Sequence, residues 1–254
     1  MARTLLVRGM LVGLAAGLVA FVAAHLFGEA AVAEAIAVEG AQARSHDTAG
    51  AAASADEPEL VSRTVQTTIG LLTATALYGV ALGGLFALAV AVAAGRLGAL
   101  SARATCAVVA AVGFVAVYLV PFLKYPSNPP AVGDPDTIDQ RTALYAAMVV
   151  LSVVVAVLAL RLGRDLTARL GAWNAVLVAM AVYTVSVGIG MLVLPDVDEV
   201  ASTFPAATLW SFRTGSIAVQ LSLWTTLGLA LGWLTQRDLD RASPARSVRP
   251  VSPL

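Results

Sequence analysis

Residues 121–141 read PFLKYPSNPPAVGDPDTIDQR, and this polar, proline-rich segment separates two groups of long apolar runs. Proline fixes φ and lacks a backbone N–H, so the five prolines of this segment cannot lie in one continuous helix. Proline-rich segments are also stiffer than Gly/Ser linkers. The sequence therefore predicts a rigid external loop, with three membrane spans before it and three after it.

The composition is typical of integral membrane proteins. The chain has 254 residues, of which 59% are hydrophobic and 13% charged, and its mean hydropathy is +0.83. About 20 apolar residues in a helix cross a bilayer core of roughly 30 Å, and a helix satisfies its own backbone hydrogen bonds there. We therefore expect an all-α integral membrane protein with six transmembrane helices in one membrane domain, residues 1–236, with spans at about 5–27, 65–94, 104–123, 142–160, 172–194 and 214–234.

The segments between the predicted spans differ in character. Residues 28–42 are alanine-rich and predict a helix that carries the first span beyond the membrane surface. Residues 43–60 are small and acidic, a composition that buries too little apolar surface to fold, so we expect a long disordered external loop. A basic turn after residue 160, an external segment at 195–213 and a cytoplasmic tail at 237–254 complete the chain.

Small residues recur every fourth position in the first two spans. Gly9, Gly13 and Gly17 share one face of the first span, and Gly79 and Gly83 repeat the spacing in the second. Missing side chains let a neighbouring helix approach closely, so we expect this face to pack against protein. The first apolar run is longer than the 7–15 residues of a signal-peptide core, which predicts an uncleaved membrane anchor.

The distribution of charge predicts the orientation. With a cytoplasmic amino terminus, most basic residues lie inside, and all acidic residues except Asp165, Asp238 and Asp240 lie outside. Cytoplasmic loops carry an excess of Lys and Arg, so both termini are predicted to be cytoplasmic. The expected location is the inner or plasma membrane, in a multi-pass arrangement within the lipid bilayer.

The sequence offers one candidate metal-binding pair. His25 and Glu29 are four positions apart, so a helix places them on one face, at the outer end of the first span. Imidazole and carboxylate groups both bind divalent first-row metals. The same two residues also fit an ordinary helix end at the membrane interface, with no role as ligands.

Four further polar residues are candidates for an external opening or a pathway. Gln66, Tyr125 and Asn128 lie close to predicted outer ends of spans, and Gln220 lies about two turns inside the last span. Polar groups within a span tend to be functional or to bridge helices. The acidic outer face would concentrate cations, although solvated loops that obey the charge asymmetry of membrane proteins would look the same.

Several functional classes are excluded by what the sequence lacks. The only lysine, Lys124, precedes tyrosine, so there is no Walker A motif, and neither HExxH nor GxSxG occurs. A single cysteine, Cys106, rules out an intrachain disulfide and a multi-thiolate metal site. The basic residues are dispersed, which argues against nucleic-acid binding. We expect neither an enzyme nor a protein with a resident cofactor.

Four stretches resemble a known family: the central proline motif, HLFGEAAVAEAIAVE (25–39), VSRTVQTTIGLL (61–72) and LPDVDEV (194–200). They are similar to the predicted cobalt transporter subunit family CbtA in its actinobacterial form, over about residues 5–234. The resemblance implies a membrane subunit for cobalt uptake in a cobalamin-related context, with Co²⁺ as the transported ion and a small, single-span, His-rich partner similar to CbtB. Nickel, zinc and copper accept similar ligands. A transporter of another small solute, or a non-transporting scaffold for a small partner, stays open.

Overall fold

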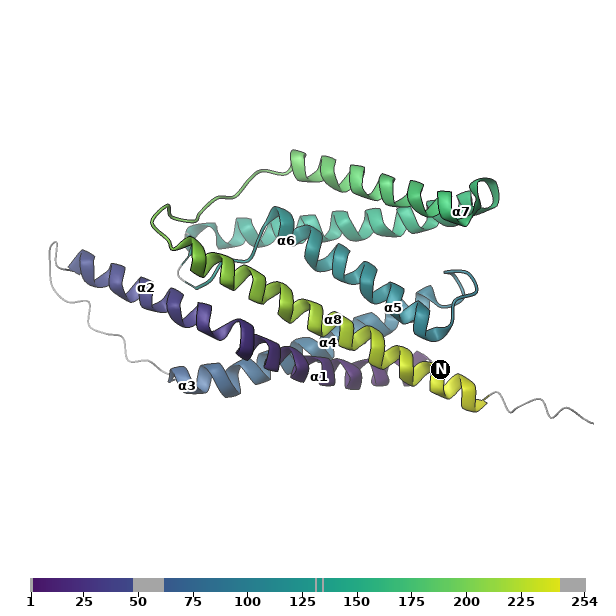
Figure 1. The fold of residues 1–254 in the computed structure, drawn as a ribbon, viewed down its shortest axis with the longest axis horizontal. Coiled ribbons are helices and arrows are strands. Elements are labelled where there is room, and N and C mark those ends of the chain that lie inside the picture. Colours follow the sequence, from purple (N-terminus) through teal and green to yellow (C-terminus); the bar gives the residue numbers. More distant parts are fainter. Residues whose placement is uncertain (1, 48–61, 131, 134, 243–254) are drawn as a thin grey trace, which may run out of the picture.

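The computed structural model describes residues 2–47, 62–130, 132–133 and 135–242, and every regular element in these ranges is helical (Figure 1). Five helical stretches are long and apolar enough to cross a membrane, as judged by length and composition. The prediction of an all-α chain with several candidate spans is confirmed. The elements are α1 (Ala2–Phe27), α2 (Glu29–Asp47), α3 (Arg63–Val65), the π-helix η1 (Gln66–Gly70), α4 (Leu71–Ala93), α5 (Ala102–Gly113), the π-helix η2 (Phe114–Leu119), α6 (Val120–Lys124), the 3₁₀-helix η3 (Pro135–Thr137), α7 (Ile138–Val193) and α8 (Ala206–Ala242).

Helix α7 is 56 residues long and consists of two arms that meet at Gly171, where φ is 75° and ψ is 161°. Glycine adopts a positive φ without the steric cost of a Cβ. The arms run antiparallel (Figure 1), and Ser152 Oγ and Tyr183 OH, one on each arm, are hydrogen-bonded at 2.8 Å. The basic turn predicted after residue 160 is therefore helical as far as the bend, because arginine and leucine are good helix formers.

Helices α1 and α4 touch through their backbones. A Cβ added to Gly13 would overlap the carbonyl oxygen of Gly79 and lie 2.9 Å from the Cα of Gly83. The expected packing of the glycine face against protein is confirmed. Helix α8 lies across α1 and α5 and buries Leu223 and Leu227 completely.

The start of α1 and the end of α8 lie at the same end of the bundle, where Arg8 forms an ion pair with Asp238.

Several helices exceed their predicted bounds. Helix α2 includes residues 43–47, the first part of the predicted disordered loop, and the rest of that loop lies outside the described residues. Helix α8 begins within the predicted external segment 195–213 and continues to Ala242, beyond the expected start of the tail; residues 243–254 also lie outside the described range. Helical hydrogen bonding does not stop at the end of an apolar run when the flanking residues favour helix.

The outer half of α7 packs mainly against α6 and η2, around a small core of Val120, Met148 and Val187. In a regular α-helix, the ring of Pro121 would clash with the carbonyl group of Val117. The π-helix η2 lies directly before Pro121, and its wider turn is consistent with this constraint. Many large apolar side chains point outward, among them Leu192, which is 87% exposed. Such a surface suits lipid, because a soluble protein rarely exposes contiguous apolar patches of this extent.

Candidate functional site

A cavity of about 640 Å³ lies at the end of the bundle that the sequence predicts to be external, between the central proline-rich segment and the first turns of α7 and α8. We call it the outer vestibule. Tyr125 and Asn128, both predicted from the sequence, line it together with Arg141, Asp198 and Arg213. Two of the predicted pathway residues are therefore brought together at one cavity.

Arg213 fastens the central segment onto α8. Its Nη2 donates a hydrogen bond to Asn128 Oδ1 at 3.0 Å, and its Nε donates to the carbonyl oxygen of Ser127 at 3.4 Å. Hydrogen bonds from a charged donor are stronger than neutral ones. The guanidinium group of Arg213, on α8, therefore holds the proline-rich segment against the start of this helix.

The proline-rich segment is also tied to the segment before α8. Tyr125 OH donates to the carbonyl oxygen of Pro195 at 2.8 Å, and Lys124 forms an ion pair with Asp196. Desolvation by burial raises the pKa of Tyr125. The charge of Lys124 lowers this pKa in part, and the charge of Asp196 raises it further. The phenol therefore keeps its proton at neutral pH and remains a donor to Pro195.

Polar side chains continue from the outer vestibule into the bundle along one face of α8. They occupy positions three or four residues apart, the spacing that aligns side chains on a helix. We call this set the polar column; it consists of Arg213, Ser216, Gln220 and Trp224. Eleven residues of helix extend about 16 Å, or roughly half of the hydrocarbon core of a bilayer.

The deeper part of the polar column holds unpaired buried atoms. Ser216 Oγ is hydrogen-bonded to Tyr118 OH at 2.9 Å. Gln220 Oε1 and Trp224 Nε1 are buried and have no hydrogen-bond partner within the described part of the chain. Such an atom costs roughly 1–3 kcal/mol unless something binds it. The polar column thus has unused hydrogen-bonding capacity at two successive turns of α8.

The wall opposite the polar column is the π-helix η2, to which Tyr118 belongs. π-Helical turns inside α-helices are frequent at functional sites. Sequence reasoning identified Gln220 but missed Tyr118, Ser216 and Trp224. The spacing of the α8 residues could have indicated them, whereas the position of Tyr118 depends on packing between distant segments.

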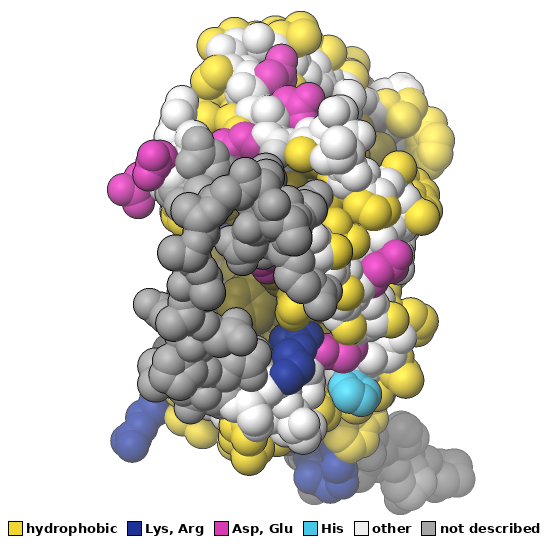
Figure 2. Space-filling view, turned by 90° about the vertical axis from the view of Figure 1, so that its left-hand side faces the viewer, with side chains coloured by type: hydrophobic (Ala, Val, Ile, Leu, Met, Phe, Trp, Pro, Cys, Tyr) yellow, Lys and Arg dark blue, Asp and Glu magenta, His cyan; other side chains and the backbone are white. Residues whose placement is uncertain are grey.

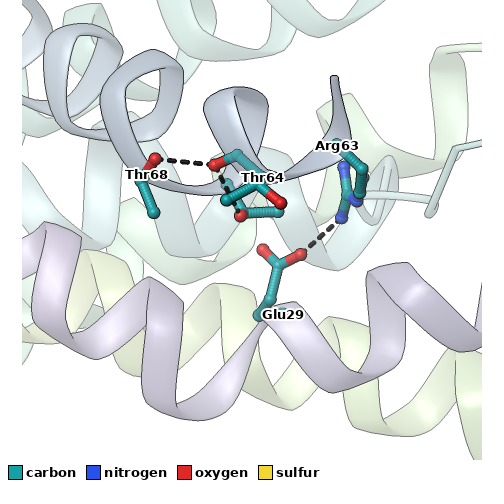
Figure 3. Close-up of polar contacts among 5 residues, drawn as sticks. Glu29, Arg63, Thr64 and Thr68 are labelled. Atoms are coloured by element: carbon teal, nitrogen blue, oxygen red, sulfur yellow. Dashed lines mark hydrogen bonds and ion pairs between the residues drawn. The ribbon is translucent and has the colours of Figure 1, made fainter.

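The predicted metal pair lies elsewhere, at the junction of α1, α2 and α3. Glu29 Oε1 forms an ion pair with Arg63 Nη2 at 2.5 Å (Figure 3). His25 is exposed and stacks on Phe21, with ring centroids 6.1 Å apart. Gln66 follows one turn after Arg63, on the exposed surface of η1. His25, Glu29 and Gln66 do not line the outer vestibule and do not belong to the polar column.

Acidic side chains are scattered across this end of the molecule instead of forming one cluster (Figure 2). Among the described residues, no group of three or more His, Cys, Asp or Glu side chains could hold a metal ion. A tightly held metal ordinarily has at least three protein ligands. Within the part of the chain that the structure describes, the chain forms no such centre by itself.

Comparisons with known proteins give one result. No curated protein and no solved structure matches the chain. The match to a family described as a probable cobalt transporter subunit covers residues 2–236, which include α1 to α7 and most of α8. A transporter subunit favours a non-enzymatic role and implies a partner in a transport complex. The chain belongs to the CbtA family of probable cobalt transporter subunits.

Proposed function

We propose that the protein is the membrane subunit of a divalent metal-ion uptake system and that cobalt is the transported ion. The family match over residues 2–236 carries this proposal. We count the two arms of α7, joined at Gly171, as separate membrane crossings, which gives six crossings together with the other four long helices. Both termini then lie in the cytoplasm, and the outer vestibule opens on the external side of the plasma or inner membrane.

The polar column is the proposed route from the outer vestibule into the membrane. Hydroxyl and amide groups on Tyr118, Ser216 and Gln220 can bind the water molecules of a hydrated cation. Conduction requires a site that attracts an ion but also releases it, and neutral oxygens hold a cation less tightly than a carboxylate cluster. The acidic side chain of Asp198 lines the same cavity as Arg213 and offsets its positive charge.

A partner subunit completes the proposed system. We propose a small, single-span, His-rich protein similar to CbtB. Its imidazoles would supply the metal ligands that the described residues do not group together. The sequence has no Walker A motif, so the energy for uptake comes from an ion gradient or from this partner.

Cellular metal content tests the proposal. We expect cells that express the chain together with its partner to accumulate cobalt, as measured by elemental mass spectrometry, and cells with either protein alone to accumulate less. Nickel, measured in the same samples, reports the selectivity. If no metal changes while the protein is present in the membrane, uptake is contradicted, and transport of another solute or a scaffold role becomes the better explanation.

The predicted ligands His25 and Glu29 have a separate test. Arg63 occupies the Glu29 carboxylate, so a metal at this pair must first displace the guanidinium. We therefore expect Arg63→Gln to lower the external Co²⁺ concentration that gives half-maximal uptake, by roughly threefold for an exposed ion pair of about 0.5–1 kcal/mol. Adding His25→Ala should remove this gain. An unchanged uptake curve in the Arg63→Gln variant would rule out this pair as ligands.

A further inference from the structure

A second and larger cavity, of about 780 Å³, lies between α4, the α5–η2 segment and the first arm of α7. We call it the inner groove. Its walls include Leu85, Ala89, Val112, Val153 and Val157. Helix α7 packs mainly against α6 and η2 and has little contact with α4 and α5, which leaves the groove between them.

Three arginines line the inner groove at the end where α4 finishes and α7 approaches its bend. Arg96 follows the end of α4, and Arg161 and Arg164 lie one turn apart on α7. Arg96 donates one hydrogen bond to the carbonyl oxygen of Val92 at 2.6 Å and keeps further N–H groups for other acceptors. These side chains come from α7 and from the turn after α4, and α4 and α7 have little direct contact, so both walls of the groove contribute positive charge.

Among the residues that the structure describes, no acidic side chain lines the inner groove to balance the arginines. In the part of the chain that the structure describes, neither Arg161 nor Arg164 forms an ion pair. Asp165 follows Arg164 in the sequence but is not part of the groove lining. An apolar groove that ends in uncompensated guanidinium groups is complementary to a molecule with a hydrocarbon chain and an anionic head.

We propose that the inner groove binds an anionic phospholipid of the cytoplasmic leaflet, with an acyl chain along the apolar walls and the phosphate at Arg96, Arg161 and Arg164. Basic pockets between transmembrane helices on the cytoplasmic side suit anionic lipid head groups. The α4 wall from Leu82 to Ala93 extends about 16 Å, close to the roughly 15 Å that one leaflet contributes to the hydrocarbon core. The length of the apolar wall and the position of the arginines therefore both fit an anionic phospholipid.

A transmembrane helix fits the inner groove less well. A helix would place its own apolar surface against the arginines, unless it carried acidic residues at that level. A lipid satisfies both parts of the groove without such a requirement.

Native mass spectrometry of the purified full chain tests this inference. Phosphatidylglycerol and phosphatidylcholine with the same acyl chains are added in equal amounts, and the bound fraction of each is compared. We expect phosphatidylglycerol to be retained about tenfold better, because its head group carries a net negative charge that the arginines attract, whereas the phosphatidylcholine head group has no net charge. Arg161→Gln/Arg164→Gln should bring the ratio to within about twofold of unity.

Two controls keep the result specific. Arg237→Gln/Arg241→Gln removes two arginines from α8, outside the groove, and should leave the ratio unchanged. Val157→Trp fills the apolar part without altering the charge and should reduce retention of both lipids, with thermal unfolding used to confirm that the variant is folded. Inorganic phosphate should not compete, since it has no acyl chain.

Three results would overturn the inference. One is equal retention of the two lipids by the wild-type protein. Another is a lipid preference that survives Arg161→Gln/Arg164→Gln. The third is complete release of phosphatidylglycerol when the partner subunit is co-purified, which would assign the inner groove to the partner's helix.

Discussion

Replacing Gly13 by valine is expected to prevent the close packing of α1 against α4 and to lower the free energy of unfolding by about 3 kcal/mol or more. Even a methyl group at this position would overlap the carbonyl oxygen of Gly79. Backbone atoms cannot rotate away as a flexible side chain can, so the two helices must separate along their whole contact. Thermal unfolding of the purified protein in detergent, together with its yield in the membrane, measures the effect.

Gly188→Val is the matched control for this prediction. Gly188 also lies within a long apolar helix, and a Cβ added there would meet no other atom within 4 Å. The control should unfold within a few degrees of the wild-type protein, because surface changes of this kind shift stability by about 0.5 kcal/mol or less. Equal unfolding temperatures for the two variants would contradict the backbone contact between α1 and α4.

Gln220→Leu is expected to lower cobalt uptake by at least about tenfold while leaving the fold intact. Leucine is similar in size but removes the buried, unpaired Oε1 from the polar column. Removing such an atom should leave the unfolding free energy unchanged or raise it by about 1–2 kcal/mol. Elemental mass spectrometry of the cells measures uptake and thermal unfolding of the purified variant measures stability; uptake should fall while stability does not.

Ser222→Ala is the matched control, since Ser222 Oγ donates to the carbonyl oxygen of Val219 on its own helix at 2.7 Å and has no place in the polar column. Its uptake should equal that of the wild-type protein. Normal uptake by Gln220→Leu would exclude the polar column as the route. If uptake and stability both fall, Gln220 stabilises the bundle instead of serving transport.

The local sequence predicted those features that depend on residues close together in the chain. Long apolar runs must form helices in lipid, because their backbone groups have no other partners there. The spacing of Gly9, Gly13 and Gly17 indicated one tightly packed face, and the glycines on α4 show the same spacing. The proline-rich segment, together with residues 25–39, 61–72 and 194–200, was sufficient to identify the family.

Helix ends were harder to predict. The arginines after residue 160 suggested a turn, but the bend falls at Gly171, because charged residues with long side chains continue a helix readily and glycine accepts a positive φ. The same argument explains why α8 starts before and ends after its apolar core.

Only the tertiary structure decided which side chains meet. Glu29 contacts Arg63, 34 positions away, and Arg213 contacts Asn128, 85 positions away, and neither pairing follows from any local pattern. The polar column became a candidate site because the fold buries Gln220 Oε1 and places Ser216 beside Tyr118. The inner groove lies between α4, the α5–η2 segment and α7, which come together only through long-range packing. Sequence periodicity determines the face on which a residue lies, whereas the long-range packing of helices determines what that face contacts.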